Sequence, residues 1–156
     1  VAVTGATNGL SVSSNNVVLG GTLTGTTTIT LSTFNLNFAE NSTGKVGVAN
    51  ASPVSGFDVN TSVSCGGIRT VTGNTTLTDT DYMLLVNNSA TATITLPAAS
   101  GVTRREYVIK KISTDTSTVV IDPNGAELID GAATYTIGSS YVSVKIKTDG
   151  TNWYIF

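Results

Sequence analysis

The sequence predicts an all-β protein: an intertwined trimeric shaft of short strands, followed by a small β-sandwich or barrel-like head. Three observations lead to this fold class. Thr, Val and Ile dominate the chain, and branched side chains suit strands better than helices. No long stretch carries its apolar residues at helical spacing. Charged and aromatic residues are unevenly distributed along the 156 residues, which indicates two modules.

The composition excludes several kinds of chemistry. Thr, Ser and Asn make up 57 of the 156 residues, while only 12% are charged, against roughly 25% in an average domain. With no His and a single Cys, the chain cannot form a Ser-His-Asp site, a structural zinc site or an internal disulfide. The net charge of −2 lacks the basic footprint of nucleic-acid binding, and no apolar run is long enough to cross a membrane. We therefore expect neither nucleic acid nor membrane among the partners.

A change in composition places the boundary between the modules near Cys65-Gly66-Gly67. Residues 1–65 hold only three charged side chains, Glu40, Lys45 and Asp58, and the other fifteen lie in 66–156 with all five Tyr. The sequence thus predicts a shaft or collar at 1–65 and a β-sandwich-like head at 66–156. Because the chain begins with Val rather than Met, we expect a processed product or a fragment.

The first module has too few large apolar side chains to form a core by itself. Ordering its backbone costs roughly 1–2 kcal/mol per residue, and its short apolar groups bury too little surface to offset that. Since low charge and branched residues also argue against disorder, we expect two further copies of the chain to complete the interior. The expected core residues of this homotrimer are Val17, Val18, Leu23, Ile29, Leu31, Phe34, Leu36 and Phe38.

The second module begins with clear strand signals. The continuous apolar run at 82–86 predicts a fully buried strand, and Thr alternates with apolar residues at 91–96 until Pro97 ends that strand. The small residues at 98–102 predict a loop or a single helical turn. Further strands are expected at 107–112 and 118–121.

The end of the chain carries turn and hairpin signals. The Asp-Pro-Asn-Gly run at 122–125 predicts a turn. Alternation at 142–147, then Asp149-Gly150, then the aromatic run at 152–156 predicts a β-hairpin, because Gly readily takes the positive φ of a tight turn. About seven strands of this kind make a small sandwich or barrel.

Acidic residues are predicted to stabilise turns rather than to do chemistry. Asp79 and Asp81 are suited to ligate a hard cation, but they also fit a polar turn before the apolar run. Asp122, Glu127 and Asp130 lie beside Pro and Gly, where acidic side chains commonly satisfy local backbone. We predict no catalytic residue, no metal site and no cofactor, and therefore no enzyme.

One basic cluster is a candidate for ligand binding. Arg104 and Arg105, with Lys110 and Lys111 nearby, are suited to meet an anionic glycan, a phosphate of lipopolysaccharide or nucleic acid. The two lysines alternate along a strand and so point to opposite faces. The alternative is ordinary solvated charge at a loop and a strand edge.

Aromatic residues offer a second candidate site. Tyr135 and Tyr141 are able to stack on sugar rings, as are Trp153 and Tyr154 near the end of the chain. A place in the core or at a subunit interface is the alternative for each of them.

Several phrases of the sequence resemble bacteriophage fibre proteins. Leu19-Gly20-Gly21-Thr22-Leu23 resembles a repeat of tail-fibre shafts. The segment at 44–59, with Gly-Lys-Val-Gly-Val, then Ser-Pro, then Phe-Asp-Val, is similar to a degenerate shaft motif, in which Val48 replaces Ile and Phe57 replaces Leu. The order of phrases from 77 to 153 resembles a β-rich module that recurs in phage fibres and related virion proteins.

The resemblance implies a homotrimeric structural fibre or spike of a virion, in the tail or on the capsid, that mediates attachment to the host surface. Its partners would be other virion proteins at the N-terminal end and a cell-surface glycan, and its location the outside of the particle. The alternative function is a carbohydrate-binding module of a secreted or cell-surface bacterial protein. That module would be monomeric, so the oligomeric state distinguishes the two.

Overall fold

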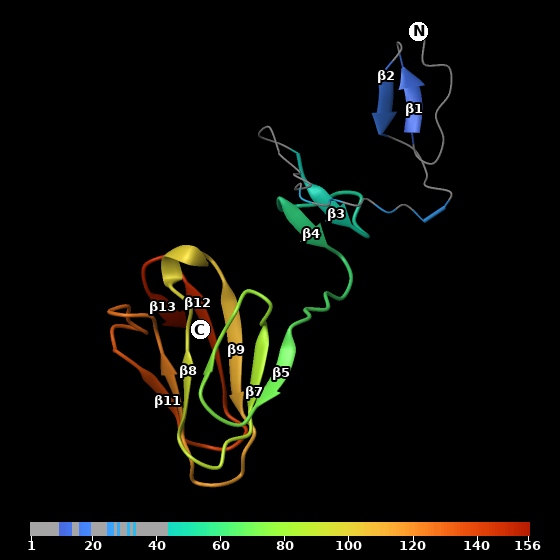
Figure 1. Ribbon diagram of the computed structural model, residues 1–156. Helices are drawn as coiled ribbons and strands as arrows, with labels where there is room; N and C mark the ends of the chain where they lie inside the picture. Colours follow the sequence, from blue (N-terminus) through green and yellow to red (C-terminus); the bar gives the residue numbers. More distant parts are fainter. Residues whose placement is uncertain are drawn as a thin grey trace. The chain divides into compact units, whose positions relative to one another are not determined.

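The computed structural model describes the backbone at 10–13 and 16–19, residues 25, 26, 28, 31 and 33, and all of 44–156. The chain divides into two units, Val1–Thr61 and Ser62–Phe156, and each is described by itself (Figure 1). Apart from one short 3-10 turn, the regular structure of the described residues is β. Their helical content includes nothing with the length and hydrophobicity needed to cross a bilayer.

Two small strand pairs make up the regular structure described in the first unit. Strands β1 (Leu10–Ser13) and β2 (Asn16–Leu19) form an antiparallel pair. Strands β3 (Val46–Val48) and β4 (Phe57–Val59) pair in parallel. In the connection between them, the Val54 amide donates to a carboxylate oxygen of Asp58 on β4 at 2.8 Å. The segment that resembles a shaft motif therefore forms a local parallel pairing.

The residues proposed for a trimer core are only partly described. Val17 and Val18 lie in β2, and Leu31 is 40% exposed. The intertwined trimeric shaft stays a prediction. The remaining candidates lie outside the described residues: Leu23, Ile29, Phe34, Leu36 and Phe38.

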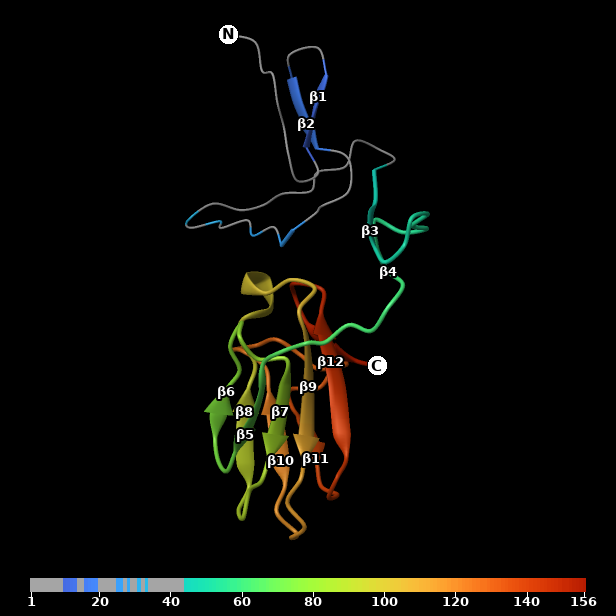
Figure 2. The same cartoon turned by 90° about the vertical axis from the view of Figure 1, so that its right-hand side faces the viewer.

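The second unit consists of two open mixed sheets (Figure 1, Figure 2). The five-stranded sheet has the order β13-β12-β9-β7-β5, formed by Trp153–Ile155, Ser143–Thr148, Glu106–Lys111, Met83–Val86 and Ile68–Val71. The four-stranded sheet has the order β11-β10-β8-β6, formed by Tyr135–Ile137, Val119–Asp122, Ala92–Thr95 and Thr75–Thr76. Because both sheets are open, the barrel-like alternative is wrong and the unit is sandwich-like.

One apolar core joins the two sheets. Alternate residues of β7, β9 and β12 are buried on the face that meets β8 and β10. Trp153 and Tyr107 are its largest members, with ring centroids 5.9 Å apart. Other fully buried core residues are Leu84, Val86, Ala92, Ile94, Leu96, Ala99, Ile109, Val119, Ile121 and Ile146.

The route of the chain differs from a series of hairpins. From β5 to β10, consecutive strands alternate between the two sheets. Strands two apart in sequence therefore become neighbours, and β5–β7, β7–β9, β6–β8 and β8–β10 all pair in parallel. Only β10–β11 and β12–β13 join consecutive strands in this unit, both antiparallel.

The prediction of a fully buried strand at 82–86 is wrong for the outer face of that strand. Leu84 and Val86 are buried, but Met83 and Leu85 are only half-buried on the outer side. The register places Met83 beside Ile68 and Val108. These three side chains form a row across the outer face, here called the apolar row, in which Ile68 is 60% exposed.

The predicted hairpin at the end of the chain is confirmed. Strands β12 and β13 pair antiparallel through a turn at Asp149-Gly150, where Gly150 has φ of +100°. A Cβ at Gly150 would lie 2.8 Å from the Thr103 hydroxyl. The hairpin turn is therefore packed tightly against the segment that precedes β9. The prediction of a loop or a single turn at 98–102 is also confirmed, since this segment contains the 3-10 turn η1 (Ala99–Gly101).

Candidate functional site

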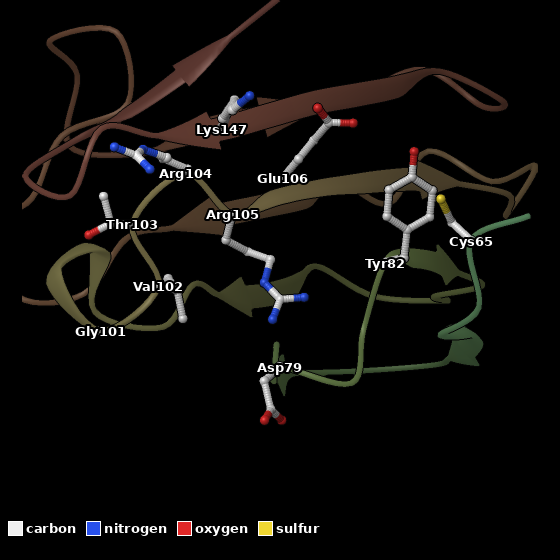
Figure 3. A pocket seen from close by; sticks show the side chains of 10 residues that line it. All are labelled: Cys65, Asp79, Tyr82, Gly101, Val102, Thr103, Arg104, Arg105, Glu106 and Lys147. Atoms are coloured by element: carbon white, nitrogen blue, oxygen red, sulfur yellow. The ribbon is translucent and has the colours of Figure 1, made fainter. Parts of the chain in front are cut away.

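An open groove of about 690 Å³ lies at the start of β9 in the second unit (Figure 3). Its basic side chains are Arg104 and Arg105, from the turn before β9, and Lys147, from the neighbouring strand β12. Its other lining residues are Cys65, Asp79, Tyr82, Gly101, Val102, Thr103 and Glu106. The groove thus gathers three of the eight basic residues of an acidic chain.

The backbone holds the arginine turn in a fixed conformation. Arg104 has φ of +69°, in the left-handed region that costs a non-Gly residue roughly 1–2 kcal/mol. Its amide donates to the Thr148 carbonyl at 3.0 Å, and the Arg105 amide donates to the Val102 carbonyl at 2.8 Å. In return, the Thr148 amide donates to the Arg105 carbonyl at 3.2 Å. Strand β12 therefore anchors both arginines through main-chain bonds.

The two arginine side chains differ in their surroundings. The Arg105 guanidinium lies 5.9 Å from the centroid of the Tyr107 ring, an arrangement that favours a cation over an aromatic face. Figure 3 shows Arg105 pointing toward Asp79 and Arg104 pointing to the other side. The cations are thus spread along the groove rather than gathered at one point.

Most other cations of the described residues have a partner. Arg69 donates to both carboxylate oxygens of Asp81, at 2.6 and 3.1 Å. Lys145 lies 2.9 Å from Glu106 in an ion pair that raises the pKa of the Lys145 ammonium. Among the described residues, the side chains of Arg104, Arg105 and Lys147 form no ion pair.

The rest of the predicted basic cluster lies elsewhere. Lys110 and Lys111 end β9, at the opposite end of the strand from the groove. As expected, they point to opposite faces: Lys111 is fully buried, and Lys110 is half-buried. The Lys110 ammonium donates to the Tyr141 carbonyl at 2.6 Å. The four basic residues therefore form no single patch.

The structure does not bring the candidate tyrosines to the groove. Tyr135 is 38% exposed in β11, at the edge of the four-stranded sheet. Tyr141 is 61% exposed, and its backbone bonds to Lys111 at the far end of β9. Of the other aromatic candidates, Trp153 is fully buried in the core and Tyr154 is exposed.

The acidic residues serve local structure. Asp81 is 3% exposed and accepts from the Thr78 amide at 2.8 Å besides its pair with Arg69. Glu127 accepts from the Ala99 amide at 2.9 Å and from the Trp153 indole at 3.1 Å. The described residues include no group of three or more acidic or sulfur ligands able to hold a metal ion.

Sequence reasoning missed Lys147 as a member of the basic site. Lys147 lies 42 residues after Arg105, and it joins the groove because β12 pairs with β9 in the register that sets Lys147 opposite Glu106. The available signal was the alternation at 142–147, which places Lys145 and Lys147 on the solvent face of one strand.

No protein-family model matches this chain, and no match is found among curated proteins.

Proposed function

We propose that this protein is a structural fibre or spike protein of a bacteriophage virion that assembles as a homotrimer and attaches the particle to the host surface. The order of the fibre-like phrases along the chain supports the proposal. A packed β unit that follows a segment with almost no charge supports it as well, since this organisation suits a head module on a shaft.

The apolar row is the observation that carries the proposal. An outer sheet face in contact with water normally carries polar residues, whereas Ile68, Met83 and Val108 occupy three adjacent strands in register. The opposite outer face, by contrast, carries Thr93 and Thr136 at matching positions beside Val120. We assign this apolar row, which ends beside Lys145 on β12, to contacts between copies of the chain.

The oligomeric state tests the proposal. Light scattering of the full chain at micromolar concentration should give three times the 16.0 kDa chain mass, and the oligomer should resist SDS without heating. Ile68→Glu should weaken the trimer, because it places a charge on the apolar row. Thr136→Glu, an equal change on the exposed face of the other sheet, should leave the trimer intact.

A virion location is tested separately. Antibodies against the chain should label fibres on phage particles, and added soluble chain should reduce adsorption of those particles to their host. A folded monomer that binds oligosaccharides would contradict the proposal and favour the carbohydrate-binding module instead.

A further inference from the structure

We propose that the groove before β9 binds an anionic sugar, a cell-surface oligosaccharide that carries carboxylate or phosphate groups. This inference rests on the proposed attachment function, for which it names the ligand class. Within the part of the chain that the structure describes, the side chains of Arg104, Arg105 and Lys147 form no ion pair, whereas Glu106, which also lines the groove, is paired with Lys145. The three cations that line the groove therefore outnumber its two carboxylates, those of Glu106 and Asp79.

The chemistry of the side chains favours carboxylate and phosphate groups. A guanidinium presents paired N–H donors that match two oxygens of a carboxylate or phosphate, and Arg105 brings such a group to the groove, 5.9 Å from the centroid of the Tyr107 ring. Lys147 adds a point charge from the adjacent strand. The groove thus offers separated anion contacts, as a sugar chain with charges on successive residues requires.

The remaining polar groups of the groove favour a hydroxylated ligand. Thr103 lines the groove beside the arginines, and the Asp79 carboxylate lies on the side toward which Arg105 points (Figure 3). A carboxylate accepts hydrogen bonds from sugar hydroxyls, which a glycan offers at every residue and DNA does not. Together with the net charge of −2, this favours a glycan over a nucleic acid.

Main-chain hydrogen bonds hold the frame of the groove in place, and a preorganised site lowers the cost of binding. The arginine turn is fixed by main-chain bonds to Thr148 on β12 and by the close approach of Gly150 to Thr103. The strained φ of Arg104 persists because these contacts hold it. Strained residues that the surrounding structure holds in place cluster at binding sites.

The test is an NMR titration of the full chain with four probes: tri-galacturonic acid, glucose 6-phosphate, neutral maltotriose and inorganic phosphate. We expect tri-galacturonic acid or glucose 6-phosphate to shift the amide signals of Arg104, Arg105 and Thr148, with a Kd on the order of 1 mM per site. The two anionic probes distinguish a carboxylate source from a phosphate source. Maltotriose should cause no shift at these amides.

Matched variants connect the binding to the groove. Arg105→Gln should weaken binding about tenfold, because it removes a charge-assisted bond. Arg105→Lys, which keeps the charge but loses the paired donors, should fall between Arg105→Gln and the unchanged chain. Lys110→Gln removes one charge at the far end of β9 and should leave the affinity unchanged.

Three results would overturn the inference: no shift at the groove with either anionic probe, equal affinity in the Arg105→Gln chain, or binding of inorganic phosphate as tight as that of glucose 6-phosphate. A trimer that fails these tests would remove the ligand assignment and leave the fibre proposal standing. A monomer that passes them would remove the fibre proposal and keep the groove.

Discussion

Arg105 and Lys111 lie at opposite ends of the same short stretch of chain, but their charged groups have different surroundings. Lys111, the last residue of β9, is fully buried, and its ammonium donates to the Ser113 carbonyl at 2.9 Å and the Asp115 carbonyl at 3.1 Å. Arg105, just before β9, has an aromatic ring beneath it and no acidic partner among the described residues. One cation is used to fix a loop, and the other is left for solvent or a ligand.

The paired cations follow a common pattern. Arg69 with Asp81 and Lys111 with Asp115 each join a strand to a neighbouring loop, and one member of each pair is buried. Around Lys111, Asn88 extends the network: its side-chain oxygen accepts from the Ser113 hydroxyl at 2.8 Å. Burial makes such groups costly to remove, whereas the free cations of the groove contribute little to folding.

The largest effect is expected at Lys111. The substitution Lys111→Met keeps the length of the side chain, but it removes a buried charge and leaves two carbonyls without their donor. We expect it to lower the free energy of unfolding by about 2–4 kcal/mol. Urea unfolding measures this loss of free energy. Lys110→Met, on the opposite face, should change the free energy by less than about 1 kcal/mol. Equal losses in the two variants would contradict the division into structural and free cations.

A smaller effect is expected at Asp81. Asp81→Asn should cost about 1–2 kcal/mol, because it removes the charge from a two-point hydrogen bond with the partly exposed Arg69. Hydrogen bonding from Arg69 lowers the pKa of Asp81 below its usual value of 3.8. The stability from this pair is therefore complete above about pH 4 and is lost as the pH falls through the lowered pKa.

Acid unfolding checks the prediction for Asp81. The difference in stability between the unchanged chain and Asp81→Asn should shrink as the pH drops below 3.8. Asp79→Asn serves as the matched control, because Asp79 is exposed and only two residues away. A difference that stays constant down to the lowest pH would show that the charge of Asp81 is not what stabilises the unit.

The smallest effect on folding is expected in the groove. Arg104→Gln, Arg105→Gln and Lys147→Gln should each change the free energy of unfolding by no more than about 0.5 kcal/mol, with Arg105 at the upper end because of its ring contact. Thermal unfolding of the three variants measures this. A loss as large as that of Lys111→Met in any of them would assign that cation to the fold rather than to binding.

The strands of the second unit could be predicted where alternation or a turn signal was local. Residues 107–112 predicted β9, and Asp149-Gly150 fixed the hairpin of β12 and β13. Three strands were missed, β5, β6 and β11, because each has only two to four residues and is too short to show an alternating pattern of its own. Parallel pairing joins residues that no local signal connects.

Only part of the candidate site could be predicted from the sequence. Arg104 and Arg105 are adjacent in the chain, so their proximity required no structure. Lys147 lies beside them only because of the register between β9 and β12. Lys111 lies apart from them because its side chain points into the core. Nothing in the sequence around Tyr135 and Tyr141 indicated that these two residues would lie away from the groove.

The alternating route from β5 to β10 has a consequence for cooperativity. Because consecutive strands lie in different sheets, no pair of neighbours in this stretch can form a stable hairpin first. Each parallel pair must close a longer loop before it gains its bonds, which predicts folding on the order of milliseconds to seconds. We expect hydrogen exchange to show one protected block from β7 to β10 rather than strands that open singly, since opening one strand removes hydrogen-bond partners from its own sheet and packing contacts from the other.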